Sequence, residues 1–125
     1  MTMPAERLRA LHFAEELLRR IASDPQTPDA MRHEAHRLAR CFPSQQELLA
    51  DRTTPGATLS PSHAEAIFNA GVFLVRLKWR DIANVEVRLL LQTVLRHYPT
   101  ERDGWRSASH LQTVPLSQML AEWEV

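Results

Sequence analysis

The residues of this chain whose types and spacing best suit chemistry are histidines in its first third. His33 and His36 are three residues apart, which puts both on one face of a helix, and Cys41 and His12 could join them. Imidazole and thiolate are ligands that zinc prefers, but a zinc site needs three or four of them. The spacing also differs from the His-Glu-x-x-His arrangement of metalloproteases. Solvated histidines are the commoner explanation, so we predict neither a metal nor another cofactor.

Cys41 is the one cysteine of the chain, and with His36 or His33 beside it the thiol could act as a nucleophile. It directly precedes Phe42 and Pro43 at the expected end of a helix, where a small buried thiol is the commoner role. The chain has three glycines, none of them clustered into a phosphate-binding loop. We therefore assign no catalytic residue and predict that the protein is not an enzyme.

The charges of the chain balance, with 15 basic and 15 acidic residues. Nonspecific nucleic-acid binding depends on a positive field, so this balance makes nucleic acid the less favoured partner. One local excess lies between Arg76 and Arg106, where seven basic residues accompany four acids. This stretch is the part of the chain that could still bind a polyanion.

The first residues lack the apolar core of a signal peptide, and a single cysteine allows no intrachain disulfide. The longest apolar stretch, near Ile67 to Leu77, is interrupted by Asn69 and is too short to span a membrane. Together these features predict a cytoplasmic protein with no membrane partner.

Capping residues and prolines divide the chain into helices. Pro4, Pro28 and Pro61 suit first-turn positions, and Ser44 with Glu47 forms a capping box, in which each side chain accepts from the other's backbone N–H. We expect helices at about 4–23, 28–42, 44–50, 61–77 and 85–98, the last capped by Asp81 or Asn84, an irregular stretch at 104–113, and a closing helix at 115–123.

Two corners of the chain match each other. Arg40-Cys41-Phe42-Pro43-Ser44 and Arg96-His97-Tyr98-Pro99-Thr100 lie 56 residues apart, and the same offset pairs further alanine, leucine and arginine positions without a gap. We interpret this as an internal duplication. The predicted fold is all-α: one domain, 1–125, formed by a helical bundle of two tandem helix-pair repeats at about 5–50 and 60–105, with a linker at 51–59 and a C-terminal extension at 106–125 that carries the closing helix.

The helix expected at 61–77 is apolar on almost every side, which predicts that it is buried all round. Gly71 within it weakens the helix, and close approach of another helix at this position could offset the cost; a flexible point is the alternative. Tyr98 has a hydroxyl to place, so we expect it at the edge of the core.

The tryptophans are the most suggestive candidates for binding. Trp79, Trp105 and Trp123 are either lids on the core, the commoner role, or exposed anchors for a partner. The candidate partner-binding residues combine tryptophans with nearby arginines: Trp105, Arg106, Trp123, Arg80 and Arg102.

The opening Met1-Thr2-Met3-Pro4, the breakers Asp24-Pro25 and Pro28, and the basic-aromatic-proline corner resemble a family of short uncharacterised bacterial proteins often found on integrative elements and genomic islands. The resemblance covers about the first 50 residues, with an echo at 96–100. Cys41-Phe42 departs from the His-Tyr expected there. The resemblance implies an accessory gene of a mobile element and carries no activity onto any residue.

The sequence has helix caps and core positions but no group of residues arranged for catalysis. Our first hypothesis is therefore a non-enzymatic protein–protein interaction module that acts as an adaptor or an inhibitor. The second is a nucleic-acid-binding regulator that uses the arginine-rich second repeat. A homodimer is compatible with both, because a short duplicated unit points to an ancestor that paired with its own copy.

Overall fold

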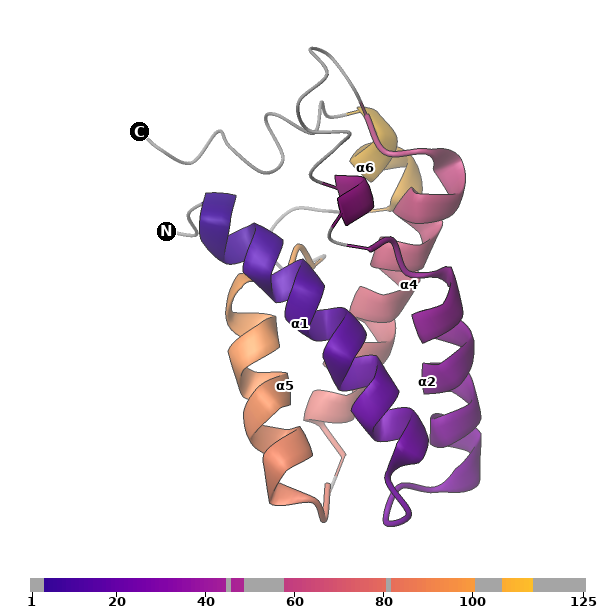
Figure 1. Ribbon diagram of the computed structural model, residues 1–125, viewed down its shortest axis with the longest axis vertical. Coiled ribbons are helices and arrows are strands. Elements are labelled where there is room, and N and C mark those ends of the chain that lie inside the picture. The colour runs from indigo at the N-terminus through magenta and orange to yellow at the C-terminus, as the bar shows by residue number, and fades with distance from the viewer. Residues whose placement is uncertain (1–3, 45, 49–57, 81, 101–106, 114–125) are drawn as a thin grey trace.

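The computed structural model describes residues 4–44, 46–48, 58–80, 82–100 and 107–113 (Figure 1). Every regular element in this part of the chain is helical, which confirms the all-α prediction. The helices are α1 (Pro4–Ser23), α2 (Asp29–Cys41), α4 (Pro61–Lys78), α5 (Val85–His97) and α6 (Ala108–Thr113), with a single helical turn at 46–48. The prediction of an irregular stretch at 104–113 is wrong for its second half, which forms α6. The closing helix predicted at 115–123 lies outside the described residues.

Side-chain caps explain where the helices begin. Ser60 Oγ accepts from the backbone N–H of His63 at 3.2 Å at the start of α4, with Pro61 in the first turn. The capping box before 46–48 is confirmed, since Ser44 and Glu47 each accept from the other's backbone N–H at 3.1 Å. The Ser44 backbone N–H is the main cause that holds the pKa of the exposed Glu47 carboxyl below its usual range, and the Ser44 hydroxyl acts the same way.

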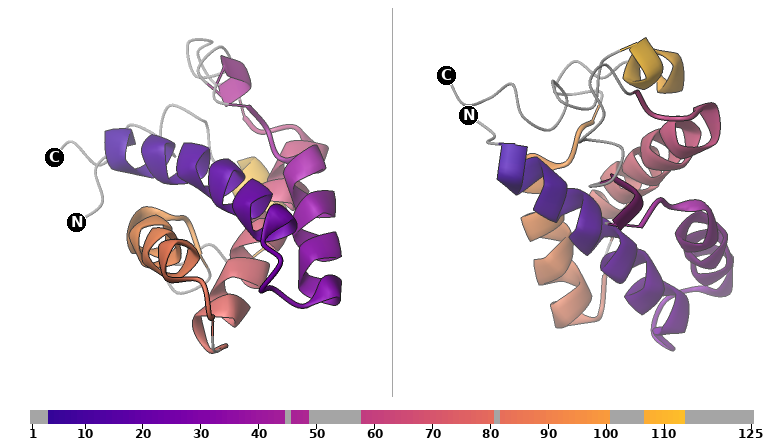
Figure 2. Two further views of the ribbon diagram at one scale, coloured as in Figure 1. Left: turned by 60° about the horizontal axis from the view of Figure 1, so that its bottom comes forward. Right: turned by 45° about the horizontal axis from the view of Figure 1, so that its top comes forward.

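The helices alternate in direction, with α1 and α4 running one way and α2 and α5 the other (Figure 1). α1 packs between α2 and α5, while α4 packs against α2, α5 and α6 (Figure 2). One continuous core fills the space between them. Its largest fully buried side chains are Leu11, Leu17, Leu18, Ile21, Leu48, Ile67, Leu74, Tyr98 and Leu111.

The turn between α1 and α2 and the turn between α4 and α5 lie at the same end of the bundle (Figure 1) and are joined by Asp24. Its carboxylate accepts from Thr27 Oγ1 at 2.8 Å and from the Gln26 backbone N–H at 3.1 Å, and it also binds the side chain of Asn84. The Thr27 hydroxyl is the main cause that holds the pKa of Asp24 below its ordinary value; Gln26, Asn84 and the charge of Arg32 act the same way, and burial opposes them. Asn84 in turn caps α5, its Oδ1 accepting from the Val87 N–H at 3.2 Å.

The bounds of α2 and α5 coincide at the offset of 56 that relates the two halves of the sequence. Both helices end at an aromatic residue in extended conformation, Phe42 and Tyr98. The packing differs, however, because α1 and α2 contact each other closely while α4 and α5 touch at fewer positions. The duplication therefore stays a prediction, and the two helix pairs are not equivalent in space.

Tyr98 lies in the core and not at its edge, so the expectation for its ring is wrong. Its hydroxyl donates to the backbone carbonyl of Ile67 at 2.6 Å, which satisfies the polar group without water. Burial raises the pKa of the phenol well above its ordinary value. The ring lies against Gly71, as the expectation of a close approach at that glycine requires, although it is a side chain and not a helix backbone that approaches.

Candidate interaction groove

α4 carries more apolar residues than one core-facing stripe needs. Ala70 and Leu74 are fully buried, as the sequence predicts, but Phe68, Val72 and Val75 are only half-buried. The prediction that this helix is buried all round is therefore wrong. α5 contacts α4 at few positions.

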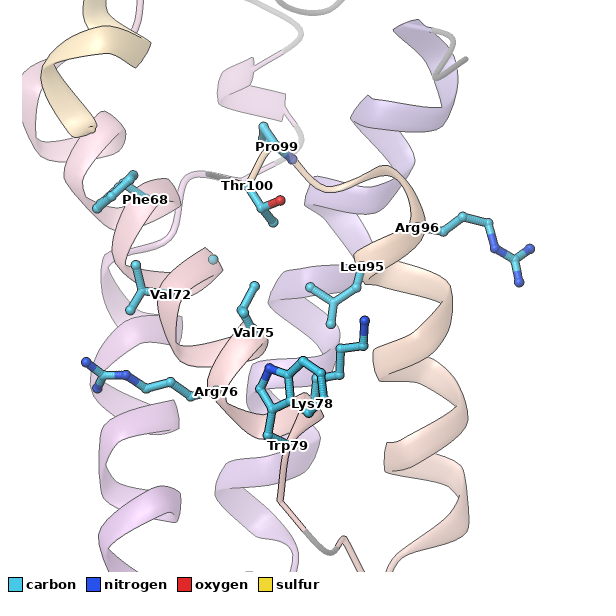
Figure 3. A pocket seen from close by; sticks show the side chains of 11 residues that line it. Phe68, Val72, Val75, Arg76, Lys78, Trp79, Leu95, Arg96, Pro99 and Thr100 are labelled. Atoms are coloured by element: carbon cyan, nitrogen blue, oxygen red, sulfur yellow. The ribbon is translucent and has the colours of Figure 1, made fainter. Parts of the chain in front are cut away.

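A groove of about 850 Å³ runs along this second stripe (Figure 3). We call it the α4/α5 groove. Its apolar lining is formed by Phe68, Gly71, Val72, Val75, Leu95 and Pro99, and the remaining lining residues are Arg76, Lys78, Trp79, Arg96 and Thr100. α4 supplies one wall along three helical turns, and the end of α5 with the following corner supplies the other.

Trp79 stands at one end of the groove, directly after the last residue of α4. Its side chain is 80% exposed, the highest value among the exposed large hydrophobic residues that the structure describes. The Lys78 Nζ lies 5.5 Å from the centroid of the indole ring, within the range of a cation–π contact. Trp79 is therefore exposed and not a lid on the core, contrary to the commoner role expected for tryptophan.

The charged residues that the structure describes along the groove are of one sign. Arg76, Lys78 and Arg96 line it, and none of the described lining residues is acidic. Lys78 reaches between the two helices toward Leu95, whereas Arg76 and Arg96 extend outward on opposite sides (Figure 3). In the part of the chain that the structure describes, no carboxylate forms an ion pair with any of these three cations.

Elsewhere on the bundle, several arginines have acidic partners. Arg19 pairs with Glu15 at 3.0 Å and Arg20 with Glu16 at 3.1 Å, both on α1. On α2, Arg32 pairs with Asp29 and Arg37 with Glu34. Among the described residues, the cations of the groove thus differ from these arginines in having no acidic partner.

Of the five sequence-predicted binding residues, the structure describes Arg80 alone, and Arg80 does not line this groove. Arg80 is exposed beside Trp79, but it lines a second cavity of about 280 Å³ between the two interhelix turns. The other four, Trp105, Arg106, Trp123 and Arg102, lie outside the described residues. Trp79 itself was not among the predicted binding residues. Two features of the sequence could have identified Trp79. It follows a helix with more apolar residues than one buried face needs, and it lies between two cations, Lys78 and Arg80.

The histidines and the cysteine of the first third are not brought together as a site. Among the described residues, no group of three or more His, Cys, Asp or Glu side chains could hold a metal. Cys41 is exposed, so the expectation of a buried thiol is wrong. His12 lies against the ring of Phe13 at a centroid distance of 5.6 Å, and His33 and His36 are exposed on α2.

No helix of the described ranges combines the length and the apolarity needed to cross a bilayer. No protein-family model, curated protein or solved structure matches the chain.

Proposed function

We propose that the protein is a non-enzymatic interaction module that binds a helical segment of another protein in the α4/α5 groove. The observation that carries the proposal is the second apolar stripe of α4, which is only half-buried at Phe68, Val72 and Val75 and ends at the 80% exposed Trp79. Apolar residues gathered in a concave surface and rimmed by charge are typical of helix-in-groove recognition.

The composition of the groove supports a protein partner. Aromatic and arginine side chains are enriched among the residues that contribute most to binding at protein interfaces, and Trp79, Arg76 and Arg96 are of these types. A binding protein of this kind acts as an adaptor or an inhibitor. The resemblance of the first 50 residues supports the further proposal that it serves a mobile element as an accessory or anti-defence protein.

Selection from a peptide library displayed on phage tests this proposal. We expect wild-type protein to enrich peptides with helical apolar spacing, and Trp79→Ala to lower their affinity at least ten-fold. Leu89→Ala is the matched control, since Leu89 is a 55% exposed apolar residue of α5 that does not line the groove. Enriched peptides that bind wild type and Trp79→Ala equally well would contradict the proposal.

The same groove favours one second candidate. Three cations beside an exposed indole are features of proteins that bind single-stranded nucleic acid by base stacking and backbone contacts. The largely apolar lining argues against it, because such proteins track the phosphate backbone with a positively charged groove. A mobility shift of a fluorescent oligothymidine at low salt, lost in Arg76→Glu, would establish this candidate; no shift up to about 100 μM protein would end it.

A further inference from the structure

We infer that the partner segment is an acidic amphipathic α-helix of about three turns, with carboxylates on both sides of its apolar stripe. This inference rests on the proposed function and names the class of partner. It follows from three properties of the groove: its length, the placement of its cations, and the position of its exposed aromatic ring.

The length of the occupant follows from the wall that α4 provides. The apolar wall begins at Phe68 and ends at Trp79, eleven residues later. At 1.5 Å per residue this is about 16 Å, or three turns of helix. A partner helix lying alongside would use apolar residues at i, i+3 or i+4, i+7 and i+11 to cover the wall.

The two cations at the rim determine the charge of the partner. Arg76 extends from the outer side of α4 and Arg96 from the outer side of α5, so a helix in the groove has one cation on each flank (Figure 3). Neither forms an ion pair with a described residue, in contrast to Arg19 and Arg20 on α1. A helix with lysines on its flanks would meet like charge on both sides.

The third cation lies at the end of the groove where the partner helix would terminate. Lys78 Nζ is held within 5.5 Å of the Trp79 ring centroid and reaches between the two helices. A cation is most favourable near the C-terminus of a helix, so Lys78 suits the last turn of the partner. The geometry favours a partner helix whose C-terminal turn lies at Trp79.

Fluorescence anisotropy with two synthetic peptides tests the inference on the full chain. Both are 15-residue helices with leucines spaced to cover the wall; one carries glutamates on both flanks and the other carries lysines at the same positions. We expect the acidic peptide to bind about ten-fold more tightly at low salt, since each of three rim pairs contributes a few-fold. The preference should shrink as salt rises to about 0.5 M.

Charge reversal provides the matched comparison. Arg76→Glu combined with Arg96→Glu should invert the preference toward the lysine peptide. Arg40→Glu should leave it unchanged, because Arg40 occupies the position in α2 that matches Arg96 in α5 but does not line the groove. A preference that survives reversal at the groove would overturn the inference.

The remaining outcomes separate the inference from the proposed function. Equal binding of both peptides, lost in Trp79→Ala, would overturn the acidic partner and leave the helix-binding groove standing. No binding of either peptide, with oligothymidine bound instead, would overturn both in favour of nucleic acid. A dimer of the free protein that dissociates in Trp79→Ala, seen by sedimentation, would also overturn the inference, because a second copy would then be the occupant.

Discussion

Tyr98 lies directly over Gly71, so closely that a Cβ atom on Gly71 would be 3.0 Å from Cε1 and 3.6 Å from Cδ1 of the ring. The missing side chain lets the tyrosine at the end of α5 reach across α4 and donate to the Ile67 carbonyl. This contact ties the corner after α5 to the middle of α4. The corner residue Pro99, next in the chain, then lines the α4/α5 groove, so the Gly71–Tyr98 contact also shapes the candidate site.

Gly71→Ala should destabilise the protein by about 1 kcal/mol, although alanine is the better helix former. The helix gains about 1 kcal/mol from the substitution, but overpacking against a fully buried ring costs about 1–3 kcal/mol. Urea denaturation measures the difference. In a Tyr98→Ala background the clash is gone, so Gly71→Ala should become stabilising there; a stabilising effect in the wild-type background would show that the ring moves away freely.

Tyr98→Phe should cost about 1 kcal/mol, because it removes the hydrogen bond to Ile67 while leaving the ring in place. The dependence of the unfolding free energy on pH should also change at alkaline pH. The phenol is held neutral in the fold, so its contribution to stability is present below the unfolded pKa of about 10 and is lost as pH rises above it. Unfolding free energies from pH 8 to 11 should fall less steeply for Tyr98→Phe than for wild type, and equal slopes would contradict this account.

Acid should weaken the end of the bundle where Asp24 joins the two turns. The pKa of Asp24 is lowered by the fold, so its contribution to stability is present above the unfolded pKa of about 3.9 and is lost as pH falls below it. Asp24→Asn should therefore flatten the loss of stability between about pH 4 and 2. Thermal unfolding across this range is the measurement. If Asp24→Asn loses stability between pH 4 and 2 as steeply as wild type, other carboxyl groups cause most of the acid destabilisation.

A substitution at Asn84 can separate its two roles, the cap of α5 and the contact with Asp24. Asn84→Asp keeps a good capping residue but places a second carboxylate beside Asp24, so it should destabilise the protein at pH 7 by about 1 kcal/mol. Protonation relieves the repulsion, and the deficit should shrink near pH 4. Ser60→Asp, at the cap of α4, is the control, where no such loss is expected. An equal effect at the two caps would argue against the contact.

The helices could be predicted because their signals are local. Ser60, Ser44 and Asn84 each act on a backbone N–H three residues away, and Pro61 occupies the first turn of its helix. α1 begins and ends at the expected residues. These signals can be read without knowing which helices pack against each other.

The groove could not be predicted in the same way, because it depends on which helices meet. A helix that is apolar on most sides can be enclosed or can present one face to a partner, and the sequence pattern is the same for both. The structure places α1 between α2 and α5, which leaves the stripe of Phe68, Val72 and Val75 half-covered. Tyr98 was misjudged for a related reason, since its hydrogen-bond acceptor, the Ile67 carbonyl, is 31 residues away in the chain.

Trp79→Ala should leave the unfolding free energy within about 0.5 kcal/mol of wild type, because an 80% exposed side chain contributes little to the core. Leu89→Ala should change the unfolding free energy equally little, so that the two variants can be compared directly in binding experiments. A large stability loss in Trp79→Ala alone would mean that the indole supports the fold.

Chemical-shift mapping locates the helix-binding site that we propose for the α4/α5 groove. The acidic 15-residue peptide is titrated into ¹⁵N-labelled protein, and amide shifts are followed along the chain. Binding in the groove predicts the largest changes between Phe68 and Trp79 and between Leu95 and Thr100, with Asp29–Cys41 of α2 unaffected. Changes centred on α2, or on the exposed Val85 and Leu89 of α5, would contradict it.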